Sequence, residues 1–307
     1  MKLLKQLYSI HSPSGQERKM KRFLKGWIKR NVGECTIRHD NFGNLYITKG
    51  EAAHYPCIVA HLDQVQERHS KDFKVLESEG ILMGYSESSH GFEGLGADDK
   101  NGIWIALSCL KKYPAMTVAF FVQEEVGCRG SSNADMDFFG DVLYVIEPDR
   151  RGAHDLITEI GWSEMCSREF IDAIEAARWQ YAPTDGMMTD IEALKERGLE
   201  VNCINLSCGY YNPHTHHEIT VIRDLLNCLD FVEHIIETIQ RPMYHQGEYR
   251  ERIDWDWMDF EDVIYSELRM DPTMRATDLY NWYHDMYPGI GLGEYEKTVN
   301  DYLKQFR

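Results

Sequence analysis

The chain has 307 residues, of which 43% are hydrophobic and 27% are charged, as is typical of a globular protein that buries a real core. Its formal net charge of −17 argues against nucleic acid or an anionic membrane as the main partner, although an acidic surface often serves solubility alone. The sequence has no run of about 18 apolar residues, the length that a membrane-spanning helix requires.

The N-terminal stretch and the cysteines together predict a cytoplasmic protein. The apolar part of residues 1–15, MKLLKQLYSIHSPSG, is too short and too interrupted for a signal peptide. The eight cysteines are scattered and form no CxxC pair, and several lie inside apolar runs such as PCIVA and LSCL. Cysteines of this kind are typical of reduced core residues in a cytoplasmic protein.

Segments with helical spacing of apolar residues alternate with short runs that predict strands. In chain order, the predicted elements are a helix at 14–32, a hairpin at 35–50, a buried strand at 56–63, a hairpin at 73–86, a helix at 100–113, buried strands at 116–125 and 141–149, helices at 170–180 and 190–198, a strand at 200–209 and a helix at 221–239. The alternation predicts an α/β fold with a mixed, largely parallel central sheet flanked by helices.

Residues 241–307 differ in character from the rest of the chain. They hold 14 Asp and Glu against 8 Lys and Arg, together with 13 aromatic residues. So many rings argue against a disordered tail. We therefore predict a domain at 1–240 and a helical, aromatic-rich C-terminal extension at 241–307 packed on it. The extension either covers a site, supplies an interface or serves packing alone.

Acidic and imidazole side chains follow the predicted buried strands. They are His61 and Asp63, then Glu124 and Glu125, then Glu147 and Asp149, with His214, His216 and His217 after the strand at 200–209 and with Asp98 and Asp99 on a loop between. Each motif alone is weak, because paired acids or a His-x-Asp are usually ordinary surface features. Since sites in open α/β sheets form at the carboxyl ends of strands, however, these groups are expected to converge.

A converging set of carboxylates needs a positive partner. Charges buried without compensation at the end of a sheet are strongly destabilising. Divalent cations remove that cost, and mixed histidine and carboxylate ligands suit zinc, with cobalt or manganese as substitutes. Cations that share the negative charge would also compensate the repulsion between the adjacent carboxylates of Asp98 and Asp99.

Five motifs occur in one order along the chain: SPSGQE, HLDQV, GLGADDKNG, VQEEVGCRGS and PHTHHE. Together they resemble the motifs of the dizinc exopeptidases, which include peptidase T-like tripeptidases and related aminopeptidases and carboxypeptidases. The resemblance covers roughly residues 8–240 and is specific as a combination. It implies a zinc exopeptidase-like fold, two zinc ions and a short peptide as substrate.

The resemblance also implies roles for the first two motifs that carry acids. His61 would bind one zinc ion, and Asp63, two residues later, would orient that histidine. Asp98 would bridge the two ions. In the family the peptide bond that follows this aspartate is often cis, and Asp99 would then point elsewhere and support the loop.

The remaining roles fall on the later motifs. Glu124 would be the general base, which takes a proton from a water activated by both ions and passes it to the leaving amine, while metal polarises the scissile carbonyl. Glu125 and His214 would bind the second ion. The fourth ligand stays open between Asp149, which tripeptidase-like relatives favour, and Glu147, which some deacylase-like relatives favour; we prefer Asp149.

One departure from the family concerns its lid. Many relatives insert a lid or dimerisation domain between the fourth and fifth ligands, but only 64 residues (214 − 149 − 1) separate Asp149 from His214 here. The lid domain is therefore expected to be absent, and the oligomeric state stays open. Arg150 and Arg151 could hold a substrate carboxylate, although surface arginines usually have no such role.

The leading hypothesis is a zinc-dependent aminopeptidase that hydrolyses short peptides. A carboxypeptidase or an N-acyl amino acid deacylase with the same metal site is the alternative among enzymes. A non-catalytic metal-binding protein with this fold and a metal-stabilised structural protein are the alternatives outside enzymes. The presence of Glu124 argues against both, because a general base is dispensable for metal binding.

Overall fold

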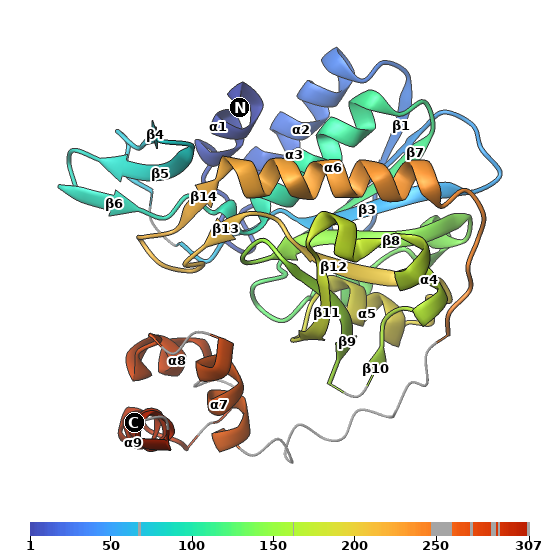
Figure 1. Ribbon diagram of the computed structural model, residues 1–307. Coiled ribbons are helices and arrows are strands. Elements are labelled where there is room, and N and C mark those ends of the chain that lie inside the picture. The colour runs from blue at the N-terminus through green and yellow to red at the C-terminus, as the bar shows by residue number, and fades with distance from the viewer. Residues whose placement is uncertain are drawn as a thin grey trace. The chain divides into compact units, whose positions relative to one another are not determined.

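The computed structural model describes residues 1–66, 69–161, 163–246, 260–270, 273–283, 287 and 289–305. Contacts divide the chain into two compact units, Met1–Tyr249 and Arg250–Arg307. The first unit holds the central sheet and its covering helices (Figure 1). Within the described residues, no helix is long and apolar enough to cross a membrane.

The central sheet has nine strands in the described part of the first unit. They are β1 (Cys35–His39), β2 (Leu45–Lys49), β3 (Tyr55–His61), β7 (Met116–Phe121), β8 (Val142–Arg150), β9 (Asp155–Ile160), β10 (Ser163–Glu164), β11 (Ala182–Gly186) and β12 (Cys203–Ser207). Their order is β1-β2-β7-β3-β8-β12-β9-β10, with β11 beside β9. The middle strands β7, β3, β8 and β12 are parallel, and antiparallel pairs flank them. The prediction of a mixed, largely parallel sheet is thus confirmed.

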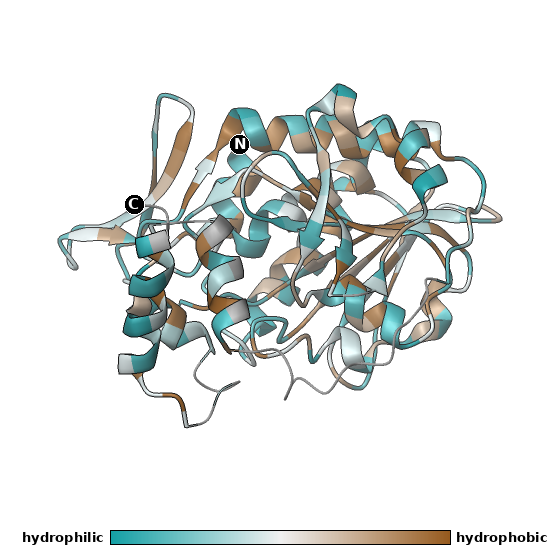
Figure 2. Ribbon diagram, turned by 60° about the horizontal axis from the view of Figure 1, so that its bottom comes forward, coloured by the Kyte–Doolittle hydropathy of each residue, from teal (hydrophilic) through white to brown (hydrophobic). Residues whose placement is uncertain are grey.

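Alternating side chains give the sheet two apolar faces. In β3, Ile58 and Ala60 pack into one core cluster, while Cys57 and Val59 pack into the other. Figure 2 shows the hydrophobic strands running through the interior between helices with hydrophilic outer sides. The first face is covered by α1 (Lys2–Tyr8), α2 (Arg18–Asn31), α3 (Ala97–Lys112) and α6 (Ile222–Thr238), and α5 (Asp190–Glu196) covers the second (Figure 1).

A second, smaller sheet joins two distant loops. It consists of β4 (Lys74–Ser78), β5 (Ile81–Ser86), β6 (Gly91–Glu93), β13 (Tyr210–Tyr211) and β14 (Ile219–Val221). The predicted hairpin at 73–86 is its β4–β5 pair, and β14 lies antiparallel to β5. Because β6 leads into the start of α3, and His214 lies between β13 and β14, this sheet brings the His214 loop toward Asp98.

Several elements differ from the sequence prediction. The helix expected at 170–180 is α4 (Arg168–Ala173) followed by a 3-10 helix (Ala176–Trp179), because Glu175 between them adopts a left-handed conformation with φ 53°. The helix α1 and the strands β9, β10 and β11 were not predicted. The three strands mix apolar and polar residues without a clear period, and their pairing partners in the sheet stabilise them. The helix α1 has only seven residues and buries Leu4, Leu7 and Tyr8 in the core.

The thiols and the C-terminal unit complete the description. All eight cysteines are free, and seven of them are buried, as predicted for core residues. The second unit contains α7 (Phe260–Met270), α8 (Ala276–Tyr283) and α9 (Leu292–Gln305) around its own apolar cluster, which includes Ile264, Leu279 and Tyr295. The prediction of a helical extension is confirmed, whereas its packing on the first unit stays a prediction.

Candidate metal centre

Five elements of the first unit carry the predicted ligands to one place. His61 is the last residue of β3, Asp149 lies near the end of β8, and Glu125 follows β7 by four residues. Asp98 lies at the start of α3, and His214 lies on the loop between β13 and β14. Because β3, β7 and β8 are parallel neighbours, their carboxyl ends meet at one edge of the sheet.

The first group of potential ligands is His61, Asp98 and Asp149. One donor atom from each lies within 4.8 Å of the others. Nε2 of His61 is 2.9 Å from Oδ1 of Asp98 and 3.6 Å from Oδ2 of Asp149. The three side chains are almost fully withdrawn from solvent, with exposed fractions of 0%, 11% and 7%.

The second group is Asp98, Glu125 and His214, whose donor atoms also lie within 4.8 Å of one another. Nε2 of His214 is 3.2 Å from Oδ2 of Asp98 and 3.1 Å from Oε2 of Glu125. Asp98 therefore takes part in both groups, with Oδ1 turned to His61 and Oδ2 turned to His214. Asp98 is thus the residue that the two groups of potential ligands share, and its role as a bridge stays a prediction.

The donor set fits metal ions. Both groups combine imidazole nitrogen with carboxylate oxygen, a mixture that suits zinc. Oε1 of Glu125 and Oδ1 of Asp149 are buried and accept no hydrogen bond from any residue that the structure describes. Buried carboxylate oxygens are costly without a donor or a cation. The residues present are thus suited to hold metal ions.

The pKa shifts of the clustered side chains also favour bound metal ions. Burial raises the pKa of Asp149, Glu124 and Glu125, and neighbouring carboxylates add to this rise. Burial opposes the charged form of His61 as well, but the charge of Asp149 and the side-chain contacts with the surrounding aspartates together outweigh it and raise the pKa of the imidazole. Without metal ions, the negative charge of the cluster could be balanced only by protons that several side chains share. Divalent cations can balance the same charge instead.

Asp63 organises three parts of the centre. Its Oδ1 lies 3.5 Å from Nδ1 of His61 and accepts the backbone N–H of Glu124 at 3.0 Å. Its Oδ2 accepts the backbone N–H of Glu125 at 3.2 Å and the hydroxyl of Ser14 at 2.7 Å. Asp63 thereby fixes the turn that presents both glutamates and faces the imidazole of His61, whereas its role in orienting that ring stays a prediction.

Asp99 is directed away from both ligand groups. The Asp98–Asp99 peptide bond is cis, as the resemblance implied. Oδ1 of Asp99 accepts the backbone N–H of Gly102 at 2.8 Å, and Oδ2 accepts the backbone N–H of His61 at 3.3 Å. Both aspartates have non-helical φ and ψ inside the first turn of α3, so the helix begins earlier than predicted but irregularly.

Glu147 has a different partner from the other acids. Its carboxylate accepts the hydroxyl of Thr189 at 2.6 Å and the backbone N–H groups of Asp190 and Ile191 at 3.2 and 3.4 Å. It therefore caps the N-terminus of α5. Of the two residues left open by the sequence, Asp149 is the one that lies beside His61.

Glu218 is a functional candidate that the sequence analysis missed. Its carboxylate accepts the backbone N–H of Gly96 at 2.6 Å and of Asp98 at 3.2 Å, and the side chain is 1% exposed. The signal was present, because Glu218 is the last residue of the PHTHHE motif. From its position at the end of a histidine motif, this carboxylate could have been predicted to accept hydrogen bonds from the backbone of another loop.

The other histidines and arginines of the motifs lie outside both groups. His216 and His217 are exposed, and the ring of His217 lies 5.8 Å from that of Phe92. Nε of Arg150 is 3.3 Å from Oδ2 of Asp155. A substrate-binding role for Arg150 or Arg151 stays a prediction.

The sequence matches no protein-family model and no curated protein. The fold, in contrast, is shared with solved peptidase structures. The aminopeptidase PepT of Bacillus cereus aligns with a TM-score of 0.63 at 14% identity, over 78% of this chain and 97% of that one. A tripeptidase of Staphylococcus aureus aligns with a TM-score of 0.62 at 15% identity, over 77% of this chain and 96% of that one. An aminopeptidase of Desulfurococcus kamchatkensis aligns with a TM-score of 0.56 at 18% identity, over 78% of this chain and 96% of that one. The chain thus has the fold of these proteins.

Proposed function

We propose that the chain is a metal-dependent exopeptidase, specifically an aminopeptidase that hydrolyses short peptides with two zinc ions. The observation that carries the proposal is the position of Asp98, whose two carboxylate oxygens face different histidines at 2.9 and 3.2 Å. The names of the structural neighbours, aminopeptidase and tripeptidase, support the same activity. The eight free thiols support the cytoplasm as its compartment.

Each ion would be held by one of the two groups, His61, Asp98 and Asp149 for the first and Asp98, Glu125 and His214 for the second. When bound, such a pair polarises a carbonyl and lowers the pKa of water. Cobalt or manganese would serve as substitutes for zinc at the same donors.

Glu124 is proposed as the general base. Its Oε2 lies 3.9 Å from Nε2 of His61, at the edge of the first group, while Oε1 accepts the thiol of Cys128 at 3.4 Å. Burial raises the pKa of Glu124, which suits a group that must take a proton and then release it. Glu124 takes the proton of the attacking water and delivers it to the nitrogen of the leaving amine.

Asp63 is proposed as a positioning residue. It holds the backbone of Glu124 at 3.0 Å and faces Nδ1 of His61 at 3.5 Å, so base and ligand are oriented by one carboxylate. The acidic surroundings of the centre also favour a substrate with a free α-amine, which is positively charged. A carboxypeptidase or an N-acyl amino acid deacylase is the alternative with the same metals.

Metal analysis followed by substrate digestion tests the proposal. The purified protein is expected to contain two zinc ions per chain after dialysis against metal-free buffer, measured by mass spectrometry. In a tripeptide digest we expect release of the N-terminal residue, together with hydrolysis of amino-acid p-nitroanilides.

Each competing function gives a different result in the same assays. Release of the C-terminal residue would identify a carboxypeptidase, and hydrolysis confined to N-acyl amino acids would identify a deacylase. Stoichiometric zinc without any hydrolysis would leave a non-catalytic metal-binding protein. Absence of bound metal, even with zinc supplied, would refute the metal centre itself.

A further inference from the structure

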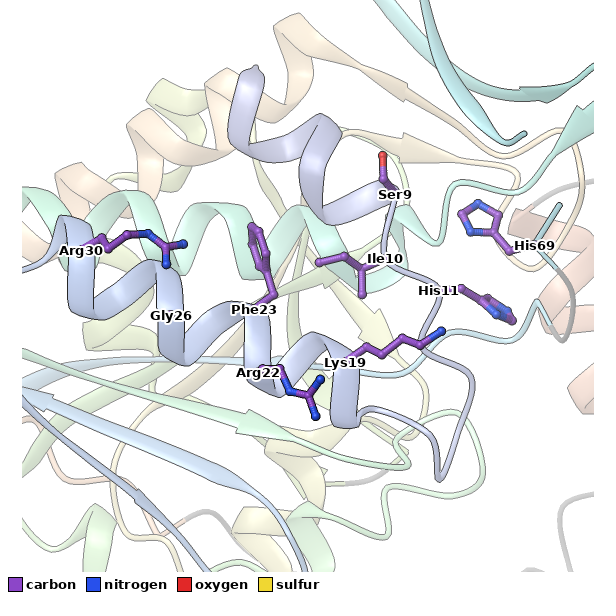
Figure 3. Close-up of a pocket in the computed structure, with 9 residues that line it drawn as sticks. All are labelled: Ser9, Ile10, His11, Lys19, Arg22, Phe23, Gly26, Arg30 and His69. Atoms are coloured by element: carbon purple, nitrogen blue, oxygen red, sulfur yellow. The ribbon is translucent and has the colours of Figure 1, made fainter. Parts of the chain in front are cut away.

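A pocket of about 500 Å³ lies beside α2, where the chain leaves α1 (Figure 3), and no candidate metal ligand belongs to its described lining. Its lining includes three cationic side chains of α2, namely Lys19, Arg22 and Arg30. The apolar side chains of Ile10 and Phe23 also line it. No Asp or Glu belongs to the described lining. A cavity of this volume lies in the range of small-molecule sites, which begins at about 300 Å³.

The charge of α2 contrasts with that of the whole chain. The helix carries seven Lys and Arg in 14 residues and no Asp or Glu, in a chain whose net charge is −17. Its apolar residues Met20, Leu24 and Ile28 are buried, so its basic side chains face outward. A concentrated positive patch on an acidic protein creates a local field that attracts anions.

Among the described residues, no acidic side chain lies within ion-pair distance of the cations of the pocket, namely Lys19, Arg22 and Arg30. The guanidinium of Arg30 folds back over Gly26, where an added Cβ would lie 3.2 Å from Nη1. The glycine therefore leaves room for this cation to line the pocket.

One end of the pocket is more polar than its middle. Lys19 and His11 extend toward each other there, and Ile10 and Phe23 occupy the middle, with Arg30 at the far end (Figure 3). The rings of His11 and His69 are 5.4 Å apart. Burial lowers the pKa of His69 to about 3 and also lowers that of His11, so both rings are neutral near pH 7. Among the lining residues, Lys19 is the cation that extends to this end, and Arg22 lies about one helical turn from it on α2. Outside the lining, the charges of Lys100 and Glu93 also act on both rings.

We propose that this pocket binds a small organic phosphate, with the phosphate group at Lys19 and Arg22 and the apolar body against Ile10 and Phe23. A phosphate monoester carries about −1.5 to −2 charges at pH 7, which matches two cations, whereas a monocarboxylate would leave one uncompensated. Arginine and lysine are the usual phosphate donors in proteins. A second hollow of about 690 Å³ shares Ser9, Ile10 and Phe23 with the pocket and extends the apolar wall.

Calorimetric titration of the metal-loaded protein with phenyl phosphate and with inorganic phosphate tests the proposal. Arg22→Ala is expected to weaken both ligands about tenfold or more, because a hydrogen bond to a charged group is lost. Phe23→Ala is expected to weaken phenyl phosphate alone. The matched control is Lys29→Ala, which removes the same charge from the same helix outside the pocket lining.

Two other sources of binding are separated by the same titrations. Phosphate held at the metal centre would survive Arg22→Ala and disappear after chelation, and that pattern would overturn the proposal. A single-stranded oligonucleotide that binds and loses as much affinity in Lys29→Ala as in Arg22→Ala would show a general polyanion surface instead. Absence of measurable binding by phenyl phosphate in the unmodified protein would also refute the site.

Discussion

Glu218 accepts a hydrogen bond from the backbone N–H of Asp98 across 120 residues of sequence, at 3.2 Å. The same carboxylate accepts the backbone N–H of Gly96 at 2.6 Å. Glu218 follows His214 on the β13–β14 loop, so this pair ties the loop of one candidate ligand to the loop of another. The shared ligand Asp98 is thus held through its backbone as well as through its side chain contacts.

Removal of the Glu218 carboxylate is expected to weaken both stability and metal binding. Glu218→Ala leaves two buried N–H groups without their acceptor, which costs about 1–3 kcal/mol each at most. Metal affinity should fall roughly 10–100-fold, as for other residues that support ligands. Glu218→Gln keeps one carbonyl oxygen and should be intermediate. Thermal unfolding and competitive metal titration measure both effects, with the exposed Glu51→Ala as control; unchanged affinity in Glu218→Ala would contradict the role.

Glu124→Gln separates catalysis from metal binding. Glu124 belongs to neither ligand group, so its amide variant should retain the metal content of the parent protein. Turnover should fall by about 10²–10⁴-fold or more, because the amide takes up no proton. Steady-state hydrolysis of a tripeptide and metal analysis of the same sample check this. Full activity in the variant would remove Glu124 from the mechanism.

The choice between Asp149 and Glu147 is open to a direct comparison. Asp149→Asn is expected to lower metal affinity strongly, because Asp149 lies in the first ligand group. Glu147→Gln should leave metal affinity nearly unchanged and instead destabilise the protein by about 0.5–2 kcal/mol, because it weakens the cap of α5. Metal titration and denaturant unfolding of both variants provide the test, and the reverse pattern would favour Glu147 as the ligand.

Removal of metal is expected to lower the melting temperature reversibly. A ligand that binds only the folded state at 100 times its Kd adds about 2.7 kcal/mol of stability. Chelation should therefore lower Tm, and zinc should restore it in a concentration-dependent way. His214→Ala, which removes a donor from one of the two groups, should show a smaller rise with zinc. A Tm that changes neither with chelator nor with zinc would argue against any metal centre.

Gly102→Ala should destabilise the protein although it places alanine in a helix. A Cβ at this position would lie 2.5 Å from both carboxylate oxygens of Asp99 and 2.6 Å from the carbonyl oxygen of Pro148. Such overpacking typically costs about 1–3 kcal/mol. The control is Gly26→Ala in α2, which meets only the movable end of Arg30 at 3.2 Å and should stabilise by up to about 1 kcal/mol. Denaturant unfolding is expected to show a lower free energy of unfolding for Gly102→Ala and a higher one for Gly26→Ala. A change of the same sign in both variants would contradict the close packing around Asp99.

The sequence predicted the central architecture because the decisive signals are local. The predicted strands at 56–63 and 116–125 carry His61 and Glu124 near their carboxyl ends, and the parallel pairing of β3 with β7 places those ends together. The periodicity of α6 was equally clear. In contrast, β9 and β11 carry no strong pattern, and they are strands because each pairs with the other in the sheet.

The supporting contacts of the centre could not be read in the same way. The side chain of Glu147 follows a buried strand just as that of Asp149 does, yet one turns to α5 and the other to His61. Two residues apart, these acids would share one face of a regular strand. The register of β8 with β12 shifts between Asn205 and Ser207, however, and no local pattern of the sequence reveals this irregularity. Which acid meets the other ligands depends on how β8 is placed between β3 and β12.

The sequence by itself determined the fold class, the order of the strands that end in acids and histidines, and the residue types able to hold two cations. These follow from periodicity and motif spacing, which act over a few neighbouring residues. Only the tertiary structure decided that Asp98 faces two histidines, that Asp99 turns to Gly102, and that Glu218 fastens the Asp98 backbone. These contacts join segments up to 120 residues apart, and their geometry comes from strand pairings such as β5 with β14 that no local pattern encodes.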